Sequence, residues 1–227
     1  MAKLTPPLKW HGGKSYLAKN IIPLMPPHLH YVETHFGGGA VLLAHDPQRD
    51  WLEGHPDFAG KSHQKGCSEV VNDLHSELTN FWRVLQNEKT FDRFKRIVDA
   101  VPFSVTEWES RQIGSGDDEV ERAVNFFIRH RQSMAGRGKS FAPYSRTRTR
   151  GRRNEQANAW WGCIEGLGDI RERLQGVAIL NDCATKVIKQ QDGKYTLFYC
   201  DPPYLKETRA TTGEYQFEMT TEQHVAL

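Results

Sequence analysis

The amino-acid sequence predicts an α/β protein in which an open parallel sheet is interrupted by a long helical insert. Four short runs rich in β-branched and aromatic residues have the length and boundaries of buried strands. About a hundred residues with helical spacing separate the second run from the third. The four runs are Tyr31–His35, Glu69–Asn72, Val177–Leu180 and Tyr195–Cys200.

Each predicted strand is followed by glycine or polar residues. The first leads into Gly37-Gly38-Gly39, the second into Asp73, the third into Asn181-Asp182 and the fourth into Asp201. Ligands of open parallel sheets bind at the carboxyl ends of the strands. We therefore expect a ligand site where these residues meet.

The stretch between the second and third strands is predicted to be helical. Apolar residues recur at helical spacing over residues 74–86, starting with Leu74, and again from Phe91 to Val98. A third helix would begin at Asp117-Asp118-Glu119 and end at Arg129-His130-Arg131, with charges that complement its dipole. Asn154 would cap a fourth helix over residues 155–165. We expect residues 1–75 and 176–227 to form one domain and residues 76–175 to form a second.

The triple glycine would let a ligand approach the backbone at the start of a helix beginning near Val41. It is not a GxGxxG fingerprint, because Leu42 stands where the third glycine would be, and a tight turn is the alternative. Asp73 strengthens a nucleotide hypothesis, since a carboxylate in that place binds ribose hydroxyls. Its alternative role is to cap the helix that follows.

The segment Tyr199-Cys200-Asp201-Pro202-Pro203-Tyr204 carries the strongest chemical signal. Two prolines stop the strand and leave a stiff loop with carbonyls available as acceptors. A carboxylate and a backbone carbonyl can bind the two hydrogens of a nucleobase amine while a tyrosine ring holds the base by stacking. A plain proline-rich turn is the alternative.

Charge is distributed unevenly along the chain, whose net charge is +2. Nine Lys and Arg residues and no acid lie between Arg129 and Asn154, so the remainder is acidic. Such a segment indicates a polyanionic partner, most often nucleic acid, with a solvated loop as the alternative. The predicted DNA-contacting residues are Arg137, Lys139, Arg146, Arg148, Arg150, Arg152 and Arg153, with Phe141 and Tyr144 interleaved.

Other classes are disfavoured by composition. The sequence has no signal peptide and no apolar run long enough to span a membrane, and its four cysteines form no CxxC pair. We therefore expect a cytoplasmic protein without disulfides or membrane association.

His55, His63 and Cys67 could ligate a metal, but no fourth ligand is evident, so we expect a surface loop and no metal site. Neither Gly13-Lys14-Ser15 nor Gly138-Lys139-Ser140 has the upstream glycine of a phosphate-binding loop.

Four motifs together resemble the Dam-type DNA adenine methyltransferases. They occur in the family's order: Lys9-Trp10-x-Gly12-Gly13-Lys14, the glycine loop, Asn72-Asp73-Leu74 and Asp201-Pro202-Pro203-Tyr204. The resemblance covers residues 8 to about 220, with the insert matching in placement more than in residues.

The resemblance implies a Rossmann-like S-adenosylmethionine-dependent domain with an inserted helical target-recognition domain, acting on double-stranded DNA without an obligate protein partner. It implies that Trp10 and Lys14 close over the methionine part of the cofactor, Asp73 binds the ribose and Asp182 lies beside the adenine. The glycines Gly37, Gly38 and Gly39 would line the cofactor. Asp201, Pro202, Pro203 and Tyr204 would form the catalytic base pocket, with Asp201 also next to the cofactor.

Two departures from the family are visible. His35 stands where phenylalanine is common, and a structural histidine is the simpler interpretation. The family continues through further strands beyond the point where this sequence ends, so we expect an incomplete sheet. Thr220 or Thr221 is predicted to cap a final helix.

Two other functions remain open on the sequence. One is a catalytically inactive remnant that still binds nucleic acid. The other is a methyltransferase for RNA or for a protein amide, because a stacked planar nitrogen is common to all three substrates.

Overall fold

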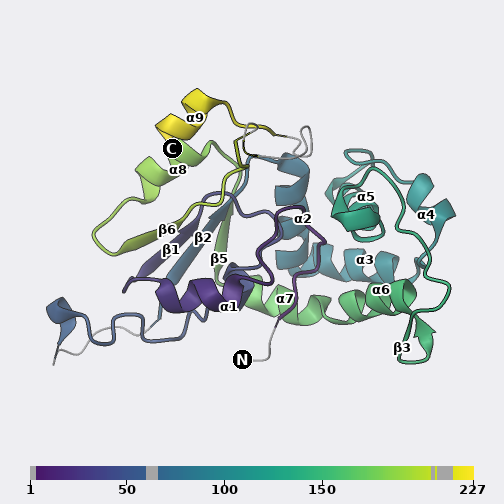
Figure 1. Ribbon diagram of the computed structural model, residues 1–227, viewed down its shortest axis with the longest axis horizontal. Helices are drawn as coiled ribbons and strands as arrows, with labels where there is room; N and C mark the ends of the chain where they lie inside the picture. Colours follow the sequence, from purple (N-terminus) through teal and green to yellow (C-terminus); the bar gives the residue numbers. More distant parts are fainter. Residues whose placement is uncertain (1–3, 60–65, 206–207, 209–216) are drawn as a thin grey trace. The chain divides into compact units, whose positions relative to one another are not determined.

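The computed structural model of the protein describes residues 4–59, 66–205, 208 and 217–227 (Figure 1). The chain divides into two compact units. Lys14–His75 and Gly176–Leu227 form what we call the sheet unit. Leu4–Gly13 and Ser76–Gln175 form the helical unit.

The sheet unit contains a four-stranded parallel sheet in the order β5-β2-β1-β6. Its strands are β1 (His30–Glu33), β2 (Ser68–Asn72), β5 (Val177–Leu180) and β6 (Thr196–Tyr199). The predicted α/β class and all four predicted strands are confirmed, with no end shifted by more than two residues. The register pairs Glu33 with Val71 of β2 and with Tyr199 of β6, so the carboxyl ends of neighbouring strands are level.

One face of the sheet is covered by α8 (Ala184–Gln191). Its Val187 is fully buried and packs with Val32 and Val70 of the central strands. Leu180 and Phe198 complete this apolar cluster. Burial of such aliphatic side chains stabilises the unit by roughly 1.5–3 kcal/mol each.

The remaining helical segments of the sheet unit are short. They are α1 (Ala18–Ile21), η1 (Ile22–Leu24), η2 (Leu42–Ala44), η3 (Pro56–Phe58) and α9 (Thr221–Ala226). The helix predicted to begin near Val41 is only the 3₁₀ turn η2. Thr220 caps α9 as predicted, because its hydroxyl accepts from Gln223 N while the Gln223 side chain accepts from Thr220 N.

The helical unit is built around α2 and α5, which pack against each other. The Phe81 and Phe127 rings stack with centroids 5.7 Å apart, and Trp160 lies against Phe127 at 5.3 Å. The elements of this unit are α2 (Ser76–Gln86), α3 (Glu88–Asp99), α4 (Val105–Glu109), α5 (Glu119–Arg131), η4 (Met134–Gly136), β3 (Thr149–Arg150), β4 (Arg153–Asn154), α6 (Glu155–Glu165) and α7 (Leu167–Leu174).

Side chains cap the starts of α3, α5 and α6 in this unit. The Asp118 carboxylate accepts from the backbone N–H groups of Val120 and Glu121, and the Asn154 amide oxygen accepts from Gln156 N. The cap at Asn154 was predicted, and Asp118 lies in the acidic run that was predicted to begin α5. The start of α2 was predicted too early: the helix begins at Ser76, and Leu74 precedes it with 55% of its surface exposed.

The segment Leu4–Gly13 belongs to the helical unit, although the sequence prediction assigned it to the first domain. Its backbone passes so close to Gly136 that a Cβ atom there would lie 1.8 Å from Lys9 O. Trp10 packs on His130, with ring centroids 5.2 Å apart. Cys163 Sγ donates to Pro7 O at 3.1 Å. These contacts hold the segment on α5, η4 and α6.

Among the described residues, no helix combines the length and the hydropathy needed to cross a membrane.

Candidate active site

Asn72 connects the ends of three strands in the sheet unit. Its Nδ2 donates to Thr34 O, after β1, and to Asp182 O, after β5, both at 3.0 Å. The Asp182 backbone N donates back to Asn72 Oδ1 at 2.9 Å. Asn72 is 1% exposed, so this network fixes the loops that follow the strands. The sequence interpretation gave Asn72 no role of its own, and the signal that could have found it was a polar residue ending an apolar strand.

The three buried glycines after β1 form a tight turn that also contacts Asp73. Gly37 and Gly39 have φ angles of 50° and 71°, in the left-handed region that favours glycine. Gly39 N donates to Phe36 O at 3.0 Å, which closes the turn around Gly38. Gly37 N donates to Asp73 Oδ2 at 2.9 Å. The glycine loop and Asp73, paired in the sequence prediction, are therefore in direct contact.

Asp73 is oriented by backbone donors on both of its carboxylate oxygens. Besides the bond from Gly37, its Oδ1 accepts from His75 N at 2.9 Å. This second bond resembles the capping role considered as an alternative, although α2 begins only at Ser76. Asp73 is half-buried, and burial raises the pKa of its carboxyl group.

The Asp201 carboxylate forms an ion pair with Lys14. Lys14 Nζ lies 2.7 Å from Oδ1 and 2.5 Å from Oδ2, and the two side chains are only 13% and 21% exposed. Burial lowers the pKa of Lys14, but its hydrogen bonds with Asp201 and Tyr204 outweigh burial and raise the pKa above its usual value. The lysine is therefore charged and places a cation against this carboxylate.

Tyr204 lies beside the same pair. Lys14 Nζ is 5.2 Å from the centroid of the Tyr204 ring, and 51% of the Tyr204 surface is exposed. Pro202 and Pro203, between the acid and the ring, are half-buried. The structure thus gathers a carboxylate, a rigid loop and an accessible aromatic ring at the end of β6.

Glu33, the last residue of β1, was not identified from the sequence. It is 2% exposed and accepts a hydrogen bond of 2.7 Å from the Tyr31 hydroxyl. Burial, together with the nearby Glu69 and Asp201, raises the pKa of Glu33 to about 8, against the bonds from Tyr31 and Leu42 that lower it. An acid at the end of an apolar strand was the signal that could have found it.

Asp182 and His35, which were also singled out in the sequence, each form a hydrogen bond with one neighbouring side chain. The Asp182 side chain is exposed and accepts from Lys186 Nζ at 2.5 Å, and this bond lowers the pKa of Asp182. His35 Nδ1 lies 2.9 Å from Thr34 Oγ1. Burial and the nearby His224 lower the pKa of His35 to about 4, so its ring is neutral near pH 7.

Trp10, the remaining predicted cofactor residue, belongs to a different unit from Lys14. It lies in the helical unit, where its ring contacts Phe126 and His130. Lys14, four residues later, lies in the sheet unit.

The basic segment contains an ordered hairpin formed by β3 and β4. Gly151 and Arg152, at its tip, have φ angles of 59° and 62°, as in a type I′ turn. Asn154 Nδ2 donates to Ser145 O at 3.0 Å and ties the hairpin base to the preceding loop. All seven predicted DNA-contacting side chains are exposed: Arg137, Lys139, Arg146, Arg148, Arg150, Arg152 and Arg153.

Of the three metal ligands weighed in the sequence, His55 and Cys67 lie within the described residues, and no potential metal-ligand cluster among those residues contains both. His55 Nδ1 accepts from Asp57 N at 3.1 Å, and the His55 ring packs edge-on against Tyr195. His63 lies outside the described residues. Cys67 instead lies near two other histidines, His28 and His45.

Comparison with known proteins gives two matches. Residues 10–227 match the family described as D12 class N6 adenine-specific DNA methyltransferases. The chain is also similar to a protein named type II methyltransferase M1.LlaDCHI, from Lactococcus lactis subsp. cremoris. The two are 26% identical over 245 residues, which cover 99% of this chain and 75% of that protein.

Proposed function

The chain belongs to the D12 class of N6 adenine-specific DNA methyltransferases, and we propose that it transfers the methyl group of S-adenosylmethionine to the N6 amine of adenine at specific sites in double-stranded DNA. The observation that carries this proposal is the group at the end of β6. There Asp201 and the exposed Tyr204 lie together, with Lys14 bound to the acid. The comparisons give the family, and the assignment of individual residues is our inference.

The polar groups of the sheet unit suit the parts of S-adenosylmethionine. Asp73 offers a carboxylate to the ribose hydroxyls, and Lys14 offers a cation to the carboxylate of the methionine part. Asp182 offers an acceptor to the adenine amine, and Leu74 offers exposed apolar surface. The glycine backbone of residues 37–39 allows close approach. Trp10 is proposed to contact the methionine part of the cofactor, as the family resemblance implies.

The proposed chemistry is positioning combined with electrostatics. When bound, S-adenosylmethionine supplies a methyl group on a positively charged sulfur. Asp201 and the Pro202 carbonyl accept the two hydrogens of the adenine amine, which brings the nitrogen lone pair toward the methyl carbon. In this proposal the amine nitrogen would form a bond to the methyl carbon as the bond from that carbon to sulfur breaks, and the sulfur would keep the electrons of the broken bond. Asp201 would stabilise the charge that develops on the amine until the amine releases a proton to solvent.

Tyr204 would hold the target base by stacking on its ring. The amine of a paired adenine is enclosed in the duplex, so the base has to leave the stack to reach Asp201. An exposed aromatic side chain next to the acid provides a surface for the extruded base.

The helical unit is proposed to recognise DNA. Its exposed arginines, concentrated on and around the β3–β4 hairpin, can contact phosphates and raise the affinity for any sequence. Other side chains of the same unit would make the base contacts that determine sequence specificity.

The decisive experiment incubates the purified chain with S-adenosylmethionine and unmethylated plasmid, then digests the DNA and measures N6-methyladenine by mass spectrometry. RNA and a mixture of proteins serve as alternative substrates, and Asp201→Ala serves as the control variant. We expect N6-methyladenine in DNA alone, formed about 10²–10³-fold more slowly or not at all with Asp201→Ala. Methylation of RNA or protein would instead identify a methyltransferase for RNA or for a protein amide. DNA binding without cofactor binding or methyl transfer would identify an inactive remnant.

A further inference from the structure

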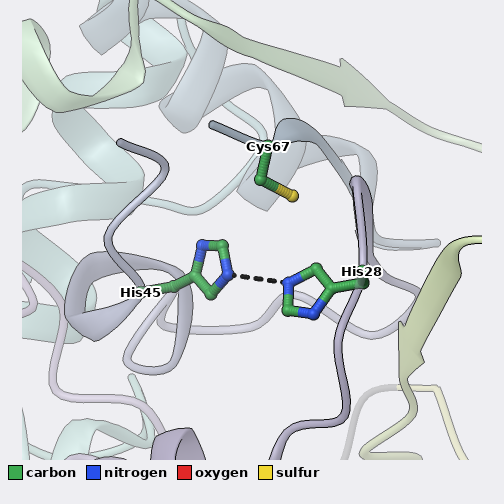
Figure 2. Close-up of side chains that lie close together, drawn as sticks. All are labelled: His28, His45 and Cys67. Atoms are coloured by element: carbon green, nitrogen blue, oxygen red, sulfur yellow. Dashed lines mark hydrogen bonds between the residues drawn. The ribbon is translucent and has the colours of Figure 1, made fainter. Parts of the chain in front are cut away.

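His28, His45 and Cys67 come together in the sheet unit (Figure 2). His28 precedes β1, His45 follows η2 and Cys67 immediately precedes β2. Their ligand atoms all lie within 4.8 Å of one another. Both histidines are 1% exposed, and Cys67 is half-buried.

In both imidazole rings the Nδ1 atom faces a hydrogen-bond acceptor. His28 Nδ1 lies 2.7 Å from Pro26 O, and His45 Nδ1 lies 2.7 Å from Glu69 Oε1. A carbonyl and a carboxylate only accept, so each Nδ1 carries the proton and each Nε2 presents a lone pair. This is the arrangement of metal-binding histidines, whose second nitrogen donates to a carbonyl or carboxylate.

The two Nε2 atoms then face each other at 3.1 Å, as Figure 2 shows. Two lone pairs at this distance require a proton or a cation between them. A shared proton would give the two rings one positive charge, which the Glu69 carboxylate would balance. Two nitrogen ligands at ~2.05 Å from a tetrahedral zinc ion lie ~3.3 Å apart, close to the observed distance.

Neighbouring aromatic rings fix the orientation of both imidazoles. The His45 ring is sandwiched between Tyr31 and Trp51, at centroid distances of 4.4 and 4.5 Å and interplanar angles of 10° and 7°. The His28 ring packs against Trp51 at 4.6 Å. The nitrogen ligands are therefore preorganised, and the entropic cost of ordering them is already met on folding.

The local charge also suits a divalent cation. Glu69 is 4% exposed and bonds to His45. A divalent cation, the Cys67 thiolate and the Glu69 carboxylate together have no net charge, which allows their burial. Imidazole and thiolate ligands favour zinc among the common divalent ions.

We propose that His28 Nε2, His45 Nε2 and Cys67 Sγ bind one zinc ion in a structural site, with the fourth position open to water. The ion links the chain before β1 to both ends of the segment between His45 and Cys67. Those ends already approach each other, since Cys67 N donates to Pro47 O at 2.8 Å. This site departs from the sequence prediction of no metal and is independent of methyl transfer.

The test loads the full chain with zinc sulfate, removes unbound metal on a desalting column and measures zinc by mass spectrometry. We expect one zinc per chain in the wild type and in Cys183→Ala, whose exposed thiol is outside the cluster. Cys67→Ala should lose the zinc. Glu69→Gln, which changes the group that orients His45, should weaken zinc binding about 10–100-fold.

A spectrum of the wild-type chain loaded with Co²⁺ completes the test without relying on any variant. We expect the near-ultraviolet band of a thiolate–cobalt bond and the visible bands of a tetrahedral ion. Absence of the thiolate band would overturn the proposal. Failure of the wild type to retain zinc, or equal retention by folded Cys67→Ala, would do the same.

Discussion

The ion pair between Asp201 and Lys14 leads to the first prediction at the scale of single residues. Asp201→Ala removes the acceptor for the target amine, so methyl transfer should fall by about 10²–10³-fold or more. DNA affinity should change little, since the basic side chains proposed to bind phosphate lie in the helical unit. Single-turnover methylation and a fluorescence-anisotropy titration with a DNA duplex measure the two effects separately.

The matched control for this prediction is Glu53→Ala, which removes an exposed acid of the same unit. It should leave both measurements unchanged. A wild-type methylation rate in Asp201→Ala would show that the acceptor has been assigned to the wrong residue.

Glu33 gives a pH dependence of stability. Burial raises its pKa from the ordinary value of 4.5 to about 8, so the folded chain binds more protons than the unfolded chain between these two values. The free energy of unfolding should therefore decrease as the pH rises through this window, by up to about 1.4 kcal/mol per pH unit. Glu33→Gln should remove this component while keeping an oxygen acceptor for Tyr31. Urea unfolding across the same pH range measures the slope.

The control for this slope is Glu53→Gln, which replaces an exposed glutamate. In this variant the free energy of unfolding should depend on pH as it does in the wild type. Parallel pH curves for wild type and Glu33→Gln would mean that Glu33 is ionised in the folded chain, contrary to its burial.

At the scale of elements, Gly136 and Gly162 form a contrasting pair within the helical unit. A Cβ at Gly136 would lie 1.8 Å from Lys9 O, and the φ angle there is +71°. Gly136→Ala should therefore destabilise the unit by more than about 1 kcal/mol, through both strain and displacement of the N-terminal segment. Thermal unfolding followed by circular dichroism measures the change.

Gly162 lies inside α6, where an added Cβ atom would meet no other atom within 4 Å. Gly162→Ala should increase stability by about 0.5–1 kcal/mol, because alanine loses less backbone entropy in a helix. Equal melting temperatures for the two variants would contradict the close approach of Lys9 to Gly136.

The β3–β4 hairpin and the basic residues just before it are proposed to contact phosphate. Replacing Arg146, Arg148 and Arg150 with glutamine should weaken binding to every DNA sequence. It should also flatten the plot of log K against log salt by up to ~0.9 for each phosphate that the variant no longer neutralises. Anisotropy titrations at several salt concentrations measure both quantities.

In a control triple variant, glutamine replaces three exposed cations of α2 and α3: Arg83, Lys89 and Arg96. This variant changes the net charge by the same amount as the first one. Its salt slope should remain close to that of the wild type. An unchanged slope in the hairpin variant would reassign the segment to a solvated surface.

Elements with strong local signals were predictable from the sequence. Asn154 caps the helix that it was expected to cap, and α5 begins within the predicted acidic run, because helix starts depend on a few adjacent residues. The predicted helix after the triple glycine is only the turn η2, and Leu74 lies outside α2. Apolar spacing alone did not locate these ends, since residues just outside a helix can match its period.

At the scale of the whole molecule, parallel topology explains what the sequence could and could not show. Polar residues after four strands were expected to meet, and the bonds from Asn72 and Gly37 confirm contacts between such loops. The His28–His45–Cys67 cluster was missed because its members are far apart in sequence. His28 and Cys67 become neighbours only because β1 and β2 pair with His30 opposite Ser68.

The last prediction concerns the folded protein and its cofactor. If the sheet unit binds S-adenosylmethionine through Asp73, then cofactor at a hundred times its Kd should stabilise the folded state by about 2.7 kcal/mol. For a chain of this length that corresponds to a shift in Tm of about 5–10 °C. Asp73→Asn should lose most of the shift, since the ribose hydroxyls lose a charged acceptor, while Glu53→Ala should keep it. Differential scanning calorimetry with and without cofactor measures the shift for each variant. A full shift in Asp73→Asn would exclude Asp73 as the ribose ligand, and no shift in the wild type would favour the inactive remnant.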